Sequence, residues 1–149
     1  MSVILLVGLV IWAGDHWVTG GFRASDYERV SPQPDGTVRI DLSNLAPSQV
    51  HFYRFLNRGN QEVRFFVGRD SGGTVQVAFD ANELCAKTKR GYRHQDEWVV
   101  CNKCDKAFRI AEVNAGGGGC KPIPLEHRVE GNQLLLAESA ILKGWRYFN

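Results

Sequence analysis

The sequence has little net charge and only one methionine. Its 18 lysine and arginine residues nearly balance 16 aspartate and glutamate residues, for a formal charge of +2, which is too small to indicate a nucleic-acid binder. There is no collagen-like repeat and no long linker rich in proline or serine. Hydrophobic residues make up an average 44% and aromatic residues 11%. A chain of 149 residues with this composition predicts one compact domain that is β-rich rather than a helical bundle.

An apolar run near the N-terminus falls short of a full bilayer crossing. It extends over Val3–Ala13, whereas a transmembrane helix needs about 20 residues. Continuing the run across Asp15 and His16 to Val18 approaches that length. No lysine or arginine precedes the run and no clear cleavage site follows it, which opposes a secretory signal peptide. We predict a membrane anchor or signal-like segment over residues 1–22, with a buried soluble element as a further alternative, then a linker over residues 23–36 and a folded domain over residues 37–149.

Alternation of apolar and polar residues predicts a β-sheet after this linker. Ser31–Gly36 is rich in turn residues, and Val38–Leu42 then alternates with a period of two. Further β-branched and aromatic runs complete an antiparallel meander of about four strands. From Asp80 to Leu125 the periodicity disappears, so we expect a loop-rich half there. The predicted fold is mainly β (α+β), and its remaining elements are strands over residues 50–56, 63–67, 75–79 and 133–137 and a short helix over residues 138–143.

Four cysteines in the loop-rich half have the spacing of a metal site. Cys101 and Cys104 form a C-x-x-C pair, and Cys85 and Cys120 each lie fifteen intervening residues away from it. Two intervening residues let both sulfurs of the pair face one point. Four thiolates form a closed tetrahedral site for a soft or borderline metal, or hold an iron–sulfur cluster.

The segment around the C-x-x-C pair is basic. Between Cys85 and Ile110, seven lysine and arginine residues stand against three acidic residues. This surplus predicts lowered thiol pKa values and a stabilised anionic centre. The first four basic residues form a predicted docking rim for a partner, or else a solvated loop; they are Lys87, Lys89, Arg90 and Arg93.

Other uses of the cysteines are weighed against a metal site. Asp105 follows Cys104, which excludes the C-x-x-C-H motif of c-type haem, and no βαβ unit supports a thioredoxin-type site. Two structural disulfides, a structural zinc ion and free thiols stay open as alternatives. His94 is the only histidine considered as an extra ligand. No serine–histidine–aspartate order stands out, so no hydrolase is supported.

Several short motifs together resemble the FtrD-like family of membrane iron–sulfur-containing proteins. The resemblance covers Val63–Leu125, with a weaker continuation to Phe148. The motifs that carry it are Val63-Arg64-Phe65-Phe66-Val67, Asp70 and Gly73, Phe79-Asp80-Ala81-Asn82-Glu83-Leu84-Cys85, Lys89-Arg90-Gly91-Tyr92-Arg93, Val99-Val100-Cys101-Asn102-Lys103-Cys104, Phe108, and Gly118-Gly119-Cys120-Lys121-Pro122-Ile123-Pro124-Leu125.

The resemblance implies a membrane-tethered, periplasmic or otherwise extracytoplasmic domain. Its cysteines carry over as metal ligands onto Cys85, Cys101, Cys104 and Cys120, while Asn82 stands where some relatives have a further cysteine. The implied cofactor is an iron–sulfur cluster or a single iron, zinc or copper ion. The implied role is electron transfer or metal handling during iron transport, beside a membrane permease or redox protein and without nucleic acid.

Three functional hypotheses follow, and we favour a non-enzymatic electron-transfer or metal-binding protein. The second is a structural subunit of a membrane assembly, whose cysteines hold zinc or form disulfides. The third is a thiol–disulfide oxidoreductase using Cys101 and Cys104. Arg23 and Arg29 follow the apolar run and would favour a cytoplasmic domain, but the family resemblance favours the outside, which we adopt.

Overall fold

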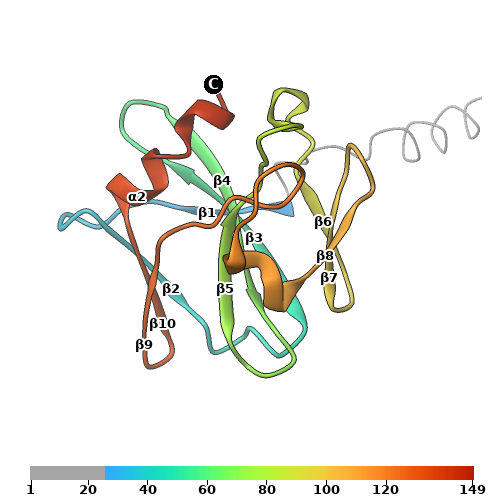
Figure 1. The fold of residues 1–149 in the computed structure, drawn as a ribbon. Helices are drawn as coiled ribbons and strands as arrows, with labels where there is room; N and C mark the ends of the chain where they lie inside the picture. Colours follow the sequence, from blue (N-terminus) through green and yellow to red (C-terminus); the bar gives the residue numbers. More distant parts are fainter. Residues whose placement is uncertain (1–25) are drawn as a thin grey trace, which may run out of the picture.

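The structure is a computed structural model that describes residues 26–149, and its architecture is mainly β. The anchor predicted over residues 1–22 lies outside the described residues. Within residues 26–149, no helix is both long enough and apolar enough to cross a bilayer. Three small sheets make up the domain, and the helices are short (Figure 1).

The central sheet has four strands in the order β1-β3-β4-β5. Strands β3 (Gln49–Leu56), β4 (Glu62–Arg69) and β5 (Val75–Phe79) form an antiparallel meander, as predicted. Strand β1 (Glu28–Val30) adds to β3 in parallel. Part of the segment predicted as a linker is therefore paired with the sheet.

The second sheet has the order β2-β10-β9, with both pairings antiparallel. Its strands are β2 (Thr37–Asp41), β9 (Arg128–Glu130) and β10 (Gln133–Ala137). The meander prediction was wrong for β2, because β2 pairs with β10 from the far end of the chain. Alternation in β2 shows only that one face is buried and does not show which strand is its neighbour. The predicted C-terminal strand and helix are confirmed, since β10 is followed by α2 (Glu138–Leu142) and a 3-10 turn, η4 (Trp145–Tyr147).

The third sheet lies in the half predicted as loop-rich, and its three short strands were not predicted. Strands β6 (Tyr92–Gln95), β7 (Trp98–Cys101) and β8 (Ala107–Arg109) pair antiparallel. Each has only three or four residues, and β6 and β8 expose most of theirs. Strands this short give little period-two signal. Two 3-10 helices flank the sheet, η2 (Ala86–Thr88) and η3 (Ile110–Ala115).

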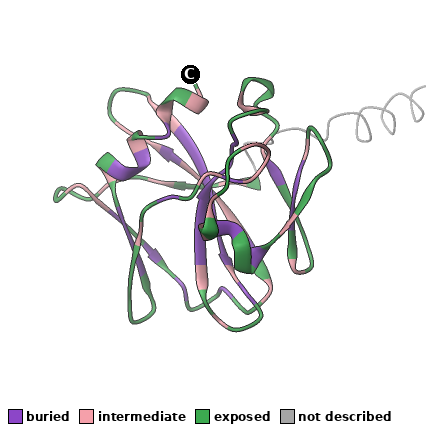
Figure 2. Cartoon of the chain, in the orientation of Figure 1, coloured by how far each residue is buried: buried purple, intermediate pink, exposed green. Residues whose placement is uncertain are grey.

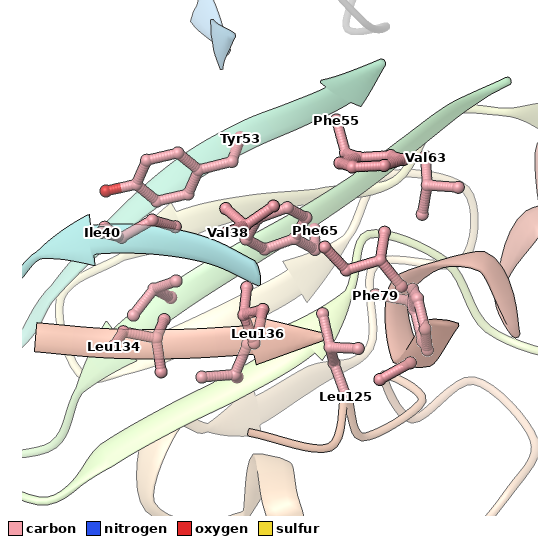
Figure 3. Close-up of a cluster of buried hydrophobic side chains, with 14 of the residues drawn as sticks. Val38, Ile40, Tyr53, Phe55, Val63, Phe65, Phe79, Leu125, Leu134 and Leu136 are labelled. Atoms are coloured by element: carbon pink, nitrogen blue, oxygen red, sulfur yellow. The ribbon is translucent and has the colours of Figure 1, made fainter. Parts of the chain in front are cut away.

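Strand β4 is covered on both faces, which explains its nearly continuous apolar sequence. Val63, Phe65 and Val67 pack toward β2, β10 and α2, in a core where Figure 3 shows side chains of the two sheets interleaved. Phe66 points the other way, into a smaller core that includes Tyr92 and Cys101. Figure 2 shows the buried residues concentrated along the central strands. The cysteine-bearing half therefore packs against the face of the central sheet that is turned away from β2 and β10.

Candidate metal centre

Three separate segments bring the thiols together. Cys85 follows the end of β5, Cys104 lies in the turn between β7 and β8, and Cys120 follows η3. The Sγ atoms of these three cysteines all lie within 4.8 Å of one another. This is the closeness that binding to a common metal would require. Their role as ligands stays a prediction.

The fourth thiol, Cys101, lies at the buried side of this group. Cys101 is 1% exposed, Cys85 and Cys120 are half-buried, and Cys104 is exposed. Cys101 is not one of the three cysteines whose Sγ atoms all lie within 4.8 Å, but Cys85 packs against the smaller core that contains Cys101. None of the four cysteines forms a disulfide in the structure. The group therefore has a buried end at Cys101 and an open end at Cys104.

The electrostatics of the group oppose free thiolates. Desolvation, followed by the neighbouring Cys101, Cys120 and Cys104 thiols, raises the pKa of the Cys85 thiol to about 12. The prediction that the basic segment lowers thiol pKa values is therefore wrong for Cys85, because thiols packed side by side resist ionisation of one another. A bound metal cation would remove this obstacle, since a coordinating thiol is deprotonated.

The C-x-x-C turn is held by backbone hydrogen bonds. The Cys101 amide donates to the Lys106 carbonyl at 2.9 Å, and the Asp105 amide donates to the Cys101 carbonyl at 2.9 Å. Asp105 adopts a positive φ of 57° to close the turn. These bonds fix the backbone of the turn between β7 and β8 that carries Cys104.

Asn82 connects two of the cysteine segments and is 2% exposed. Its side-chain carbonyl accepts hydrogen bonds from the amides of Cys85 at 2.7 Å and Leu84 at 3.1 Å. Its Nδ2 donates to the Cys101 Sγ at 3.6 Å. Asn82 therefore positions Cys85 and donates a hydrogen bond to the sulfur of Cys101.

Tyr92 connects the third segment and pairs with Cys101 across β6 and β7. Its hydroxyl accepts a hydrogen bond from Asn82 Nδ2 at 2.9 Å and donates one to the Cys120 carbonyl. We call Asn82 and Tyr92 the brace, because together they link the backbones of Cys85 and Cys120 to Cys101. Tyr92 was noted in the sequence only as part of a motif, and its spacing gave no sign of this role.

The chain segments before and after Cys120 both help to fix its position. Before it, Gly116–Gly119 all have positive φ values, from 63° to 129°. Residues other than glycine rarely adopt this backbone conformation. After it, the chain runs beside β5, where the Phe79 amide donates to the Ile123 carbonyl at 2.8 Å. The Ile123 amide in turn donates to the Ala81 carbonyl at 3.3 Å.

A buried carboxyl lies behind the brace. Asp80 is 1% exposed, and its carboxylate oxygens accept hydrogen bonds from the Tyr27 hydroxyl and from the Tyr92 amide, the latter at 2.7 Å. Burial raises the pKa of Asp80 from 3.8 to about 7, although these two hydrogen bonds and the Arg64 charge oppose the shift. Arg64 also donates to the Lys89 carbonyl at 3.3 Å. The segment that leads from β5 to Cys85 thus starts at Asp80, within this network of polar side chains.

Asp80 gives the domain a pH-dependent stability. Its pKa is higher folded than unfolded, so its contribution is complete below about pH 4 and is lost as pH rises toward 7. Relative to Asp80→Asn, the metal-free wild type should lose about 1 kcal/mol of unfolding free energy per pH unit over this window. Urea denaturation at several pH values measures this. As a control, Asp41→Asn changes an exposed carboxyl and should leave the dependence of unfolding free energy on pH as in the wild type over this window. The same pH dependence in the wild type and in Asp80→Asn would contradict the raised pKa assigned to Asp80.

The other predicted site residues lie as follows. Lys87, Lys89, Arg90 and Arg93 are all exposed, on η2 and on the turn and strand that follow it. Arg93 forms an ion pair with Asp105 at 3.0 Å. The His94 Nε2 lies 2.9 Å from the Ser48 carbonyl and 2.7 Å from the Asp96 carbonyl. His94 is not part of the group of close ligand atoms found among residues 26–149.

Comparison with known proteins identifies the family. The profile described as "Membrane iron-sulfur containing protein FtrD-like" matches residues 45–148. The chain belongs to the FtrD-like family. The match confirms the resemblance seen in the sequence and extends it from β3 to η4, with all four cysteines included. No curated protein and no solved structure is significantly similar to the chain.

The donor set can be compared with the cofactor that the name of the FtrD-like family implies. Iron–sulfur clusters are held by cysteine thiolates, commonly four of them, and four thiols lie together here. The same set also suits a single zinc or iron ion. The residues present therefore fit a thiolate-bound metal centre, with Cys85, Cys101, Cys104 and Cys120 as the residues that could hold it.

Proposed function

We propose that this chain is a membrane-anchored, extracytoplasmic protein whose four cysteines bind a metal or iron–sulfur centre for electron transfer or metal handling beside an iron transport system. The observation that carries the proposal is the convergence of Cys85, Cys104 and Cys120 within 4.8 Å, with Cys101 in the buried core against which Cys85 packs. The membrane association follows the description of the FtrD-like family. The anchor over residues 1–22 and the periplasmic side belong to the proposal.

The residues of the site suit an electron-transfer centre in two ways. The buried Cys101 and its hydrogen bond from Asn82 shield one side and stabilise negative charge on sulfur. The exposed Cys104 leaves the other side accessible. When bound, the metal centre supplies a change of one oxidation state, with the electron donated by a reduced redox protein and accepted by an oxidised partner.

The surface around the open side suits an acidic partner. Lys87, Lys89 and Arg90 are exposed directly after Cys85 in the chain. Leu84, on the other side of Cys85, is 71% exposed. An apolar contact flanked by positive charge favours docking of a protein that carries negative charge around its own redox centre.

Reversible redox spectroscopy tests the proposed function. The full chain, with its N-terminal segment, would be purified anaerobically in detergent and then reduced with dithionite and reoxidised with ferricyanide. We expect visible charge-transfer bands that disappear and return with each cycle. Bound zinc without visible colour, or oxidised thiols without metal, would overturn electron transfer and favour a structural subunit.

The docking rim predicts a charge effect on reaction rates. Reversing Lys87 and Lys89 to glutamate should slow oxidation of the reduced protein by the anion ferricyanide about threefold to tenfold at low salt, because electrostatic attraction is lost. The difference should shrink at high salt. Stopped-flow absorbance measures both rates.

A matched double variant controls for net charge. Arg39 and Arg128 lie on β2 and β9, in the sheet on the other side of the molecule from β6–β8 (Figure 1). Reversing both to glutamate changes the net charge equally and should leave the rate nearly unchanged. Equal slowing by the two double variants would remove the docking rim from the proposal.

A further inference from the structure

The spacing of the thiols carries an inference about what they hold. Resting on the proposed metal-binding function, we infer that Cys85, Cys101, Cys104 and Cys120 bind one metal ion in a four-thiolate site, and not a cluster of several irons bridged by inorganic sulfide. The two arrangements use the same ligands and differ in how far apart those ligands must stand. The inference therefore depends on distances within the site and on what holds them.

The distances favour a single ion. Thiolates bound to one tetrahedral ion at about 2.3 Å are separated by about 3.8 Å. The Sγ atoms of Cys85, Cys104 and Cys120 all lie within 4.8 Å of one another, so a movement of about 1 Å or less brings them to that spacing. Cys101 lies outside this group of three and would have to approach it as the fourth ligand. In an iron–sulfur cluster held by four cysteines, each iron takes at most two of them, and thiolates on different irons are separated by the irons and bridging sulfides. At least one of these three close thiolates would therefore have to move away from the others.

The brace opposes such a separation. Asn82 holds the Cys85 amide and the Cys101 sulfur through opposite ends of one carboxamide. Tyr92 holds Asn82 and the Cys120 carbonyl through one hydroxyl. Both side chains are buried, at 2% and 3% exposed. Because buried polar groups are costly to leave without partners, spreading the three cysteine segments would break bonds that closing onto one ion leaves intact.

The C-x-x-C turn limits how far Cys101, the fourth cysteine, can move away from the other three. Its backbone is fixed by the hydrogen bonds between Cys101 and Lys106 and between Asp105 and Cys101. Cys101 is packed in the smaller core with Tyr92 and Val99, so its sulfur has little room to retreat. Cys104 is exposed to solvent, whereas Cys85 and Cys120 are half-buried.

Metal and sulfide stoichiometry tests the inference. The full chain purified anaerobically in detergent would be analysed for metals by mass spectrometry and for acid-labile sulfide by a colorimetric assay. The metal-free protein would then be incubated with excess ferrous iron and sulfide, desalted and analysed again. We expect one metal ion per chain in both cases, without stoichiometric sulfide.

Two variants show whether the ion occupies the thiols. Cys104→Ser changes an exposed ligand and should fold, but lose the bound ion. Lys106→Ser changes an exposed residue two positions further along and should keep it. Circular dichroism would verify that both variants fold.

Each outcome distinguishes the inference from the proposed function. Two to four irons with matching sulfide, in either preparation, would overturn the single-ion inference and leave the metal-binding function standing. Absence of metal in both preparations, or full retention of metal by Cys104→Ser, would overturn both. One redox-active iron per chain without sulfide supports both, whereas one zinc ion that iron does not replace supports the single ion and removes electron transfer.

Discussion

Replacement of Cys101 by serine is expected to lower the affinity for the bound metal at least about 100-fold, because it removes a thiolate donor from the buried end of the site. Since binding free energy is also folding free energy for the residues that hold a metal, the segment from Cys85 to Cys120 should loosen. The sandwich of β2, β10 and the central sheet has its own core and should stay folded. A competing chromophoric chelator measures the affinity, and hydrogen exchange measures protection of each sheet.

Ala78→Ser is the control for burying a hydroxyl. Ala78 is fully buried in the same core as Cys101, and the change leaves every thiol in place. It should lower stability modestly and leave metal affinity unchanged. Wild-type affinity in Cys101→Ser would show that three thiols suffice, and uniform loss of protection across all sheets would show that the two cores do not unfold separately.

Gly91→Ala should destabilise the domain by about 3 kcal/mol or more. Gly91 has a φ of 63°, and a Cβ built there lies 2.3 Å from the Asp80 Oδ2. The carboxyl would have to leave the Tyr27 hydroxyl and the Tyr92 amide that it binds. A displaced Tyr92 would then disturb the hydrogen bonds of the brace, so the affinity for the metal should fall as well. Urea denaturation and chelator competition measure the two effects.

Gly131→Ala separates steric collision from backbone strain. Gly131 has a φ of 59°, and a Cβ added to it would meet nothing within 4 Å. This substitution should cost only about 1 kcal/mol, the cost of a left-handed conformation for alanine. Equal losses at Gly91 and Gly131 would contradict the role assigned to the contact between Gly91 and Asp80.

The sequence predicted the parts of this fold that depend on local pattern. Strands β3, β4 and β5 were expected from β-branched and aromatic runs, and β10 has the predicted bounds. Partner choice between distant strands is not a local property, which is why β2 was assigned to the wrong sheet. The strands β6–β8 were missed because each has only three or four residues, which is too few to make a periodic pattern.

The sequence predicted the set of cysteines in the candidate site but not the burial and the hydrogen bonds around them. The C-x-x-C pair and two outlying cysteines indicated the residues that the structure brings together. The pKa of Cys85 could not be predicted from charge counting, because it depends on burial and on three thiols packed beside it. Asn82 and Tyr92 act through hydrogen bonds that form only when β5, β6 and the glycine-rich loop meet.

The hydrogen bond between Tyr27 and Asp80 also limits the reach of the whole domain. If the bilayer ends near residue 22, as proposed, five peptide steps separate it from Tyr27 and span at most about 18 Å. Tyr27 is hydrogen-bonded to Asp80, behind the cysteines. The proposed anchor would therefore join the domain at its metal-binding half and not at the sheet of β2, β9 and β10. Under this proposal, so short a connection would keep the centre close to the lipid surface, where it would meet integral membrane proteins more readily than freely diffusing ones.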